Sequence, residues 1–426
     1  MSQPVLVLLT NHFPFGKGEA FIEPEIELLE KKFSKILIIT VSTETELTRN
    51  CSHQTLFMPI HAGLKDYFSA IAVLFSAAFT IIDLIRKERK SHEIKIWRST
   101  SGRIFIHDLF KALTYASRIR NFLEPFEKEE KILYSYWLNN RSLAAVIAAK
   151  MMGNTRVIAR VHGGDLYTER HQENYLPFRP FLASSLQALC FISEHGRVYF
   201  NERYKLKNQT NQFISRLGTT DFGLNPDSHN GDEVTLVSCS FMEPVKRLDF
   251  MIQVIASITK LNVHWIHLGG GSLEKEIRRL AEQFISSNSG RRFTLKGTLS
   301  PQEIRNFYLQ HPIHVFLNTS SSEGIPVAMM EAASAGIPLI ATAVGGIPEI
   351  VSEENGILLP RGATAESFSE AIQRLVSSPD YKSFRIGARN VWERSFNAEV
   401  NFSNFADILL KLHNETGSGN SGISQR

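Results

Sequence analysis

Residues 313–351 constrain this chain more than any other stretch. An apolar run, Ile313–Leu317, leads through a polar turn into Val327–Ala335, which is rich in the good helix formers Ala, Met and Glu. Pro326 suits the first turn of a helix, where its missing N–H costs nothing, and Gly336 is a natural helix stop. The pattern predicts a strand, a turn and a helix whose N-terminus offers free N–H groups and a positive dipole end to an anion such as phosphate.

Short apolar segments alternate with longer helical stretches along the whole chain, which predicts an α/β fold with parallel sheets. The expected strands are Val5–Leu9, Lys35–Val41, Ile132–Tyr134, Arg156–Val161, Ala188–Ile192 and Phe213–Arg216, then Val234–Ser238, Val263–Leu268, Phe293–Lys296, Ile313–Leu317 and Leu339–Ala341. A segment rich in Gly, Asn, Asp and Pro separates the two series. We therefore expect an N-terminal domain over 1–220, a linker over 221–232 and a C-terminal domain over 233–394, with a tail at 414–426 too polar to order.

Composition narrows the class of protein. A chain of 426 residues suggests two or three domains of about 150 residues each. A net charge of +4 argues against a dedicated nucleic-acid binder, so no nucleic-acid partner is expected. The three cysteines form no C-x-x-C pair, which predicts neither a disulfide framework nor structural zinc and fits a reduced compartment. The N-terminus runs directly into an apolar strand without a basic region or cleavage site, and the expected location is cytoplasmic.

Two carboxylates frame the turn and helix of residues 313–351. Glu323 lies in the turn and Glu331 in the second turn of the helix. A carboxylate is a poor ligand for phosphate, but it is a good acceptor for sugar hydroxyls. An ordinary surface helix with two solvated glutamates is the alternative. With EGIPVAMMEA, SAGIPLIAT and GGIPE in that order, the segment resembles the E-x7-E signature of family 4 retaining glycosyltransferases, in sequence texture those of bacterial surface-polysaccharide synthesis.

The resemblance implies the GT-B fold, in which two Rossmann-like, doubly wound parallel-sheet domains face each other across a cleft. A C-terminal helix at about 395–413 would cross back onto the N-terminal domain. The implied reaction moves a hexose from a nucleotide-diphosphate sugar, with UDP favoured, to a saccharide or lipid-linked saccharide acceptor, with retention at the anomeric carbon. No cofactor and no divalent metal are implied. Glu331 would bind the ribose and Glu323 the hexose, and neither would act as a glycosidase acid or base.

Two positions of the first half carry weaker signals. Gly16 and Gly18 follow the first strand, where glycine lets the backbone approach a ligand; a simple tight turn is the alternative. His162 ends a strand in RVHGGDLY, and a carboxylate such as Asp165 would fix its tautomer; a structural histidine is the alternative. The resemblance implies that Gly16 reaches the donor diphosphate and that His162 lies beside the transferred hexose, as a catalytic residue together with Glu323 and Lys246.

The segment VSCSFMEPVKRLD at 237–249 supplies a cation. Lys246 follows the first strand of the second series and is well placed to neutralise a diphosphate leaving group; a solvated lysine at a helix start is the alternative. It matches the lysine of the family's G-R-L-x-P-x-K-G pattern. The chain departs from that pattern because Ser240 or Phe241 stands at the family's arginine and Arg247 replaces the following glycine. We treat Ser240 and Arg247 as donor-binding candidates.

The remaining donor-binding candidates lie in turns. Gly270 in LGGGSLE and Gly297 in KGTLS resemble the family loops that border the nucleotide. Gly324, Ile325 and Pro326, between the two glutamates, complete the set.

Residues 67–85 are nineteen largely apolar residues, close to the length of a bilayer span. The stretch 86–103 carries seven Lys/Arg against two Glu. Three interpretations remain open: a buried or partly buried helix, an in-plane membrane helix with a basic flank, and a true span. We favour peripheral membrane contact through 67–103, on the inner face of the cytoplasmic membrane, without a transmembrane helix.

The sequence lacks the catalytic and nucleotide-binding motifs of several other enzyme classes: it has no D-x-D, no G-x4-G-K-[ST], no G-x-S-x-G and no H-E-x-x-H. Two rivals remain. One is a non-catalytic GT-B subunit that supports a partner glycosyltransferase, which the altered arginine position favours. The other is a GT-B sugar-nucleotide epimerase, which would turn over the donor without an acceptor. Oligomeric state is left open.

Overall fold

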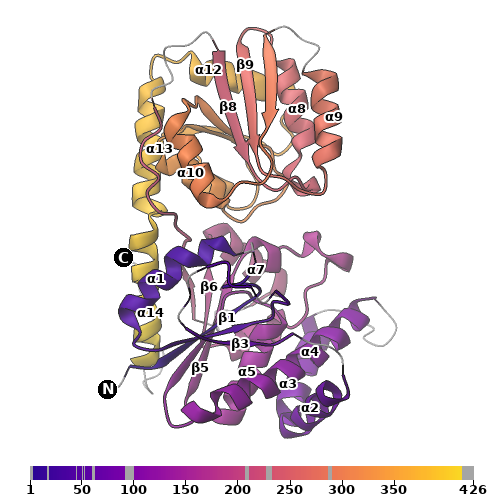
Figure 1. Cartoon of the computed structure of the whole chain (residues 1–426). Helices are drawn as coiled ribbons and strands as arrows, with labels where there is room; N and C mark the ends of the chain where they lie inside the picture. Colours follow the sequence, from indigo (N-terminus) through magenta and orange to yellow (C-terminus); the bar gives the residue numbers. More distant parts are fainter. Residues whose placement is uncertain are drawn as a thin grey trace. The chain divides into compact units, whose positions relative to one another are not determined.

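The structure is a computed structural model that describes residues 3–16, 19–44, 46–49, 51, 53–59, 63–91, 100–206, 211–226, 233–285 and 290–414. The chain forms two compact units. The N-terminal unit comprises the residues up to Ser215 together with the segment from Phe402 onward, and the C-terminal unit comprises Arg216–Asn401. Each unit contains one parallel sheet covered by helices (Figure 1).

Within the described residues, the sheet of the N-terminal unit has seven strands in the order β3-β2-β1-β4-β5-β6-β7, all parallel. Their bounds are β1 Val5–Thr10, β2 Ile36–Thr40, β3 Gln54–Phe57, β4 Lys131–Ser135, β5 Thr155–Val161, β6 Ala188–Phe191 and β7 Gln212–Ile214. The six strands expected in this half are confirmed, with shifted ends. The edge strand β3 was not predicted. Strand β1 is buried along its whole length, as expected for a parallel sheet covered on both faces.

Successive residues of β1 point into two different cores. Leu6 and Leu8 pack with Phe405 and Leu409 of the last helix, whereas Val7 packs into the larger cluster beneath α4 and α5. The helices are α1 Glu23–Lys32, α2 Leu64–Ser76, α3 Ala78–Ser91, α4 Thr100–Leu123, α5 Asn140–Met152, α6 Arg179–Ser185, α7 Glu194–Tyr204 and α14 Ala398–Asn414. Helix α14 therefore completes one face of a sheet that is otherwise built from residues before Ser215.

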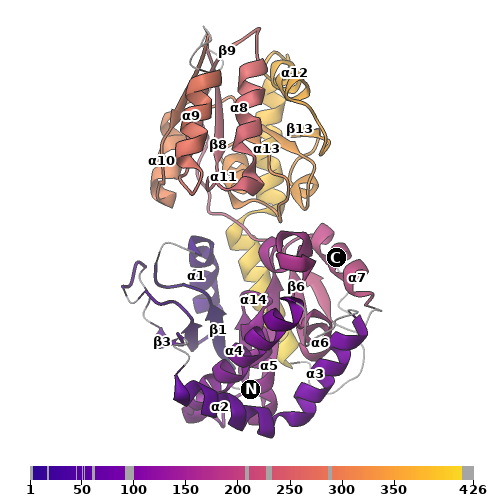
Figure 2. The same ribbon diagram turned by 90° about the vertical axis from the view of Figure 1, so that its right-hand side faces the viewer.

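The C-terminal unit has six parallel strands in its described part, in the order β10-β9-β8-β11-β12-β13. The strands are β8 Glu233–Cys239, β9 Asn262–Leu268, β10 Arg291–Leu295, β11 Val315–Asn318, β12 Leu339–Thr342 and β13 Gly356–Leu359. The helices are α8 Leu248–Ser257, α9 Glu274–Phe284, α10 Pro301–Gln310, α11 Val327–Ser334, α12 Ala365–Val376 and α13 Tyr381–Ser395. Figure 2 shows α8 and α9 side by side against this sheet. All five expected strands are confirmed, and the edge strand β13 was missed.

The segment 313–351 folds as strand, turn and helix, with one correction. Pro326 is not inside the first turn: its φ of −68° and ψ of 124° are extended, and α11 starts at Val327. Proline still fits this place because its own N–H is not needed as the helix begins. Gly336 follows the end of the helix with a φ of +65°, as a helix-stopping glycine does.

The apolar segment 67–85 is not one helix. It is divided between α2 and α3, which meet at Ala77 at an angle of 86°. No single helix among the described residues is long and apolar enough to cross a membrane, although this bent pair meets the length and composition criteria jointly. One side of the pair is buried and the other is exposed, so the helices are partly buried, as the first interpretation expects, and membrane contact stays a prediction.

Several expectations fall on residues outside the described ranges. They concern Gly18 of the first turn, 92–99 of the basic flank, 227–232 of the expected linker and 415–426 of the tail. The first half of that linker packs into the C-terminal unit: the buried Asn225 side chain donates to the carbonyls of Tyr308 and His311 and accepts from the N–H of Ile313.

Candidate donor site

The strand order of the C-terminal unit reverses between β8 and β11, and the loops that follow these two strands are joined there. The Ser321 N–H donates to the Val245 carbonyl at 2.8 Å, and the Thr319 hydroxyl donates to the carbonyls of Lys246 and Arg247 at 3.1 Å. In doubly wound sheets, such a reversal point at the carboxyl ends of the strands is where ligands bind.

Two of the predicted residues meet at this point. The Lys246 ammonium lies 2.6 Å from Glu323 Oε1, and the Ser320 hydroxyl donates to the same oxygen at 2.7 Å. Glu323 is buried, and Lys246 is partly exposed at the end of the short helix Pro244–Lys246. The Glu323 carboxylate thus holds the partly exposed Lys246 ammonium at the switch point, and the ammonium is the group of this pair that an anion would contact.

The turn after Glu323 is held by two glycines that the sequence analysis noted as a motif without assigning a role. Gly345 has a φ of +56°, and a Cβ there would lie 1.7 Å from the Glu323 carbonyl oxygen. The Gly346 N–H donates to the Gly324 carbonyl at 2.8 Å, and Ile325 is buried beneath. The GGIPE motif therefore positions the Glu323 turn through close backbone contact.

Glu331 projects from the second turn of α11. It is partly buried, and no side-chain hydrogen bond to it occurs within the described residues. Burial raises the pKa of its carboxyl to about 7. A partly buried carboxylate without a hydrogen-bond partner among the described residues is well suited to accept hydroxyl donors from a ligand.

Glu331→Gln should raise the melting temperature at pH 8 and change it little at pH 5. The pKa of Glu331 is raised above its unfolded value, so the folded state favours the protonated form. The native protein then loses stability as pH rises from the unfolded pKa to about 7, and glutamine removes that loss. Thermal unfolding of both proteins at the two pH values measures the difference. Equal melting temperatures at pH 8 would contradict the raised pKa.

The other turns of this sheet edge are joined by backbone contacts. The Met242 N–H donates to the Gly270 carbonyl at 2.9 Å, and the Gly269 N–H donates to the Gly297 carbonyl at 2.8 Å. The Ser240 carbonyl accepts from His267 Nε2 at 3.1 Å. Ser240, Gly270 and Gly297 therefore lie together at the ends of β8, β9 and β10, at the same edge of the sheet as the ion pair.

Arg247 does not join the ion pair. It has a φ of 52°, in the left-handed region, and its guanidinium carbon lies 4.4 Å from the centre of the Phe250 ring. The side chain thus packs against α8, which gives no support to Arg247 as the replacement for the family arginine. Phe241, one of the two residues at the place of that arginine, is exposed.

His162 ends β5 in the N-terminal unit, and its side chain is only 5% exposed. Its ring lies 5.0 Å from the ring of Tyr136 and 4.5 Å from that of Trp137, measured between centres. Burial, together with the charge of Arg160, holds its pKa well below the usual range, so the imidazole is neutral. Nε2 is buried without a hydrogen-bond partner in the described part of the chain. That nitrogen is thus a buried polar atom whose hydrogen-bonding capacity is unused within the described residues.

Contrary to the prediction, the Asp165 carboxylate does not contact the imidazole of His162 and does not fix its tautomer. Its carboxylate accepts from the backbone N–H of His162 at 2.7 Å and from that of Leu138 at 2.6 Å. The imidazole forms a hydrogen bond with the backbone of Tyr136 instead. Asp165 thus connects the loops after β4 and β5 and positions the backbone around His162.

Gly16 lies in a loop that is organised by Glu19, which is not among the predicted site residues. Glu19 is buried, and its carboxylate accepts from the backbone N–H groups of Asn11, His12 and Phe13 and from the Trp137 indole. Gly16 has a φ of +65°, and a Cβ there would lie 2.5 Å from Glu44 Oε2. Gly16 and His162 belong to the N-terminal unit, so their contact with a donor held by the C-terminal unit stays a prediction.

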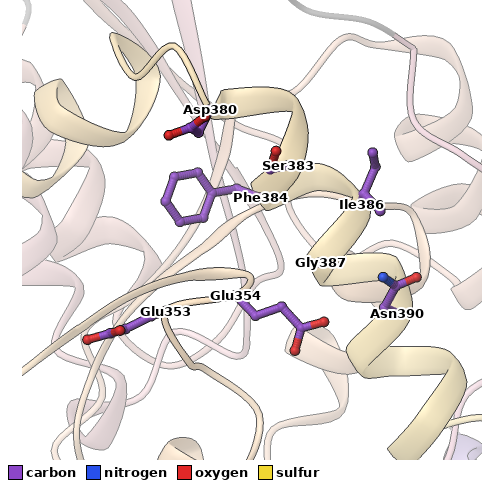
Figure 3. Close-up of a pocket in the computed structure, with 8 residues that line it drawn as sticks. All are labelled: Glu353, Glu354, Asp380, Ser383, Phe384, Ile386, Gly387 and Asn390. Atoms are coloured by element: carbon purple, nitrogen blue, oxygen red, sulfur yellow. The ribbon is translucent and has the colours of Figure 1, made fainter.

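A separate pocket of about 440 Å³ lies between α13 and the loop before β13. Figure 3 shows Asp380, Phe384 and Asn390 on the helix side, facing Glu353 and Glu354. None of the predicted site residues lines it. Its acidic lining makes it a poor site for a nucleotide diphosphate.

A comparison with known protein families finds a match in the C-terminal unit. Residues 224–391 match the family model described as Glycosyl transferases group 1. The ion pair, Glu331 and the surrounding turns all lie inside this match. The match to the glycosyl transferases group 1 model therefore lies within the C-terminal unit, Arg216–Asn401.

Individual relatives resemble parts of the chain. The O-antigen biosynthesis glycosyltransferase WbnH of Escherichia coli is 30% identical over 140 residues, which cover 33% of this chain and 36% of that protein. The putative colanic acid biosynthesis glycosyltransferase WcaL of Escherichia coli K12 is 26% identical over 214 residues, covering 47% of this chain and 51% of that protein. One subunit of the human phosphatidylinositol N-acetylglucosaminyltransferase is 30% identical over 159 residues, covering 37% of this chain and 31% of that protein. The chain thus matches about a third to a half of the length of these relatives.

A solved structure covers nearly the whole chain. Anabaena HepE, in complex with UDP and glucose, superposes with a TM-score of 0.65 at 14% identity, covering 96% of this chain and 99% of that one. With two Rossmann-like parallel-sheet domains, the chain has the GT-B fold.

Proposed function

We propose that this protein is a retaining glycosyltransferase that moves a hexose from a nucleotide-diphosphate sugar, with UDP favoured, to a saccharide or lipid-linked saccharide in surface-polysaccharide synthesis. The reaction uses no divalent metal and takes place at the cytoplasmic side of the membrane, with peripheral contact through 67–103. The WcaL and HepE relationships support the pathway class and the nucleotide.

The observation that carries the proposal is the Lys246–Glu323 pair at the switch point of the family-matched sheet. A free ammonium there would bind the diphosphate, and a freed carboxylate would accept hexose hydroxyls. In the unliganded site the two groups neutralise each other, which reduces the cost of keeping Glu323 buried. A bound donor would replace the contact between Lys246 and Glu323 with two others, one between Lys246 and the diphosphate and one between Glu323 and the hexose.

The chemistry breaks the bond between the anomeric carbon and the diphosphate oxygen and forms a bond from the acceptor oxygen on the same face. The acceptor proton passes to the departing phosphate. Negative charge grows on that phosphate, where Lys246 and the N-terminal N–H groups of α11 stabilise it. Glu331 accepts the ribose hydroxyls, and the neutral His162 donates to or accepts from the hexose through Nε2.

A second candidate function rests on one observation. The family arginine is absent, and Arg247 packs on Phe250 instead of the diphosphate position. A non-catalytic GT-B subunit that binds nucleotide and supports a partner enzyme would tolerate this loss.

A thermal-shift panel of UDP-, GDP- and ADP-sugars in EDTA tests the proposal. The matching donor, at 100-fold its dissociation constant, should stabilise the protein by about 2.7 kcal/mol, and UDP-sugars should give the largest shift. Donor consumption with an extract of lipid-linked saccharides then measures transfer. Stabilisation without turnover would favour the non-catalytic subunit, and turnover without any acceptor would favour an epimerase. No shift with any donor would contradict the donor site itself.

A further inference from the structure

Helices α2 and α3 each expose large apolar side chains. On α2, Leu64, Phe68, Ile71 and Phe75 follow one another at spacings of four, three and four residues, so they share one face. Beyond the bend at Ala77, α3 exposes Phe79 and Ile82. Phe68, Phe75 and Phe79 are 70%, 77% and 91% exposed. Single exposed apolar residues are ordinary, but a row of this length is a contact surface.

The exposed face of α3 becomes basic toward the end of the helix. Phe79 and Ile82 are followed at helical spacing by the exposed Arg86 and Arg89, with Lys90 beside them. We call these residues together the α2–α3 face: Leu64, Tyr67, Phe68, Ile71, Leu74, Phe75, Phe79, Ile82, Arg86, Arg89 and Lys90.

The three acidic residues of the two helices are neutralised or buried. Asp66 pairs with Arg118 at 2.6 Å, and Asp83 pairs with Lys87 at 2.9 Å. Glu88 is fully buried and accepts from the Tyr175 hydroxyl at 2.6 Å and from the Phe178 N–H at 3.2 Å. The contacts of Asp66 and Glu88 also fasten α2 and α3 to the rest of the N-terminal unit. The α2–α3 face therefore presents apolar and positive groups without an unpaired carboxylate.

We propose that the α2–α3 face docks on an anionic lipid surface, with the aromatic row at the boundary of headgroups and acyl chains and the basic end among the headgroups. A positive, apolar face on helices lying in the plane of the interface is the arrangement that such surfaces bind. A protein partner would have to offer an equally acidic and apolar groove. The inference deepens the proposed membrane contact and is independent of sugar transfer.

Vesicle flotation of the full chain tests the docking. Wild-type protein should float with phosphatidylcholine vesicles that contain about a third phosphatidylglycerol, less so in high salt, and poorly with pure phosphatidylcholine. The variant Phe68→Ser/Phe75→Ser/Phe79→Ser should lose at least about 10-fold in bound fraction. Arg86→Gln/Arg89→Gln should lose the preference for anionic vesicles. The matched control Ile386→Ser, an exposed apolar residue of α13, should bind as wild type does.

A second measurement does not depend on the multiple variants folding. Phe75→Trp should show fluorescence that is quenched by brominated acyl chains beyond the wild-type background.

No flotation of the wild type, full flotation of the triple serine variant, or absence of quenching would overturn the docking. Self-association in buffer that the serine variant abolishes, without vesicle binding, would assign the face to a second copy. Transfer to a soluble saccharide without vesicle binding would contradict the docking alone, and vesicle binding without transfer would contradict the proposed function alone.

Discussion

Lys246→Ala and Glu323→Gln should each lower kcat/KM for sugar transfer by about 100-fold or more. The lysine is a positive charge at the switch point, and the glutamate is the carboxylate beside it, 2.6 Å away. Initial rates over a range of donor concentrations measure the loss. The double variant should lose much less than the product of the two single losses, because each group is positioned by the other.

The matched control for this pair is Lys275→Ala, which removes an exposed lysine from α9. It should leave transfer unchanged. Thermal unfolding of all variants separates a lost contact with the donor from a damaged turn, since the amide oxygen introduced by Glu323→Gln can still accept from the Ser320 hydroxyl. An unchanged transfer rate in Glu323→Gln would remove the sugar-positioning role, and full additivity in the double variant would remove the coupling.

Arg160→Met should destabilise the N-terminal unit by about 3–5 kcal/mol, because it leaves a buried carboxylate without its partner. Arg160 is completely buried, and its guanidinium lies 2.9 Å from Glu25 and 4.3 Å from the centre of the Phe405 ring of α14. It also donates to the Tyr134 hydroxyl at 2.6 Å. Burial raises the pKa of Glu25 because it disfavours the charged carboxylate, and the positive charge of Arg160 opposes this effect. The charged state of Glu25 therefore depends on this arginine.

Calorimetry of the two units measures this effect, and the transition of the C-terminal unit should stay in place. The exposed pair Arg292–Glu233, at 2.6 Å, is the control: Arg292→Gln should cost at most about 1 kcal/mol. Adding Glu25→Gln to Arg160→Met should recover part of the loss by removing the unpaired charge. A shift no larger than that of Arg292→Gln would show that Arg160 contributes little.

The sequence predicted those features of the fold and the site that depend on residues close together in the chain. The alternation of strands and helices, and the strand, turn and helix around Glu323, follow from local pattern. The missed strands β3 and β13 are short, partly exposed edge strands, QTLF and GILL, without a long apolar run or strict alternation. Such strands exist because a neighbouring strand supplies hydrogen bonds, which a single segment does not reveal.

Other features depend on contacts between distant residues or on unusual backbone angles. Glu19 has a φ of 61°, and this conformation turns its carboxylate back onto the N–H groups of the first loop. Nothing in the sequence GEAF distinguishes it from a glutamate at a helix start. Likewise Arg247 adopts a left-handed conformation that removes its side chain from the expected site. The bend at Ala77 contains neither proline nor glycine, so the sequence predicted one segment where two helices form.

The place of α14 has a consequence for the order of synthesis. Phe405, Ala406, Leu409 and Leu412 fill one face of the first sheet, yet they are translated after the entire C-terminal unit. While the ribosome makes that unit, Leu6 and Leu8 of the first strand lack their final cover. The N-terminal unit therefore matures last although it is made first, and during this interval its uncovered face is the part of the chain most in need of a chaperone.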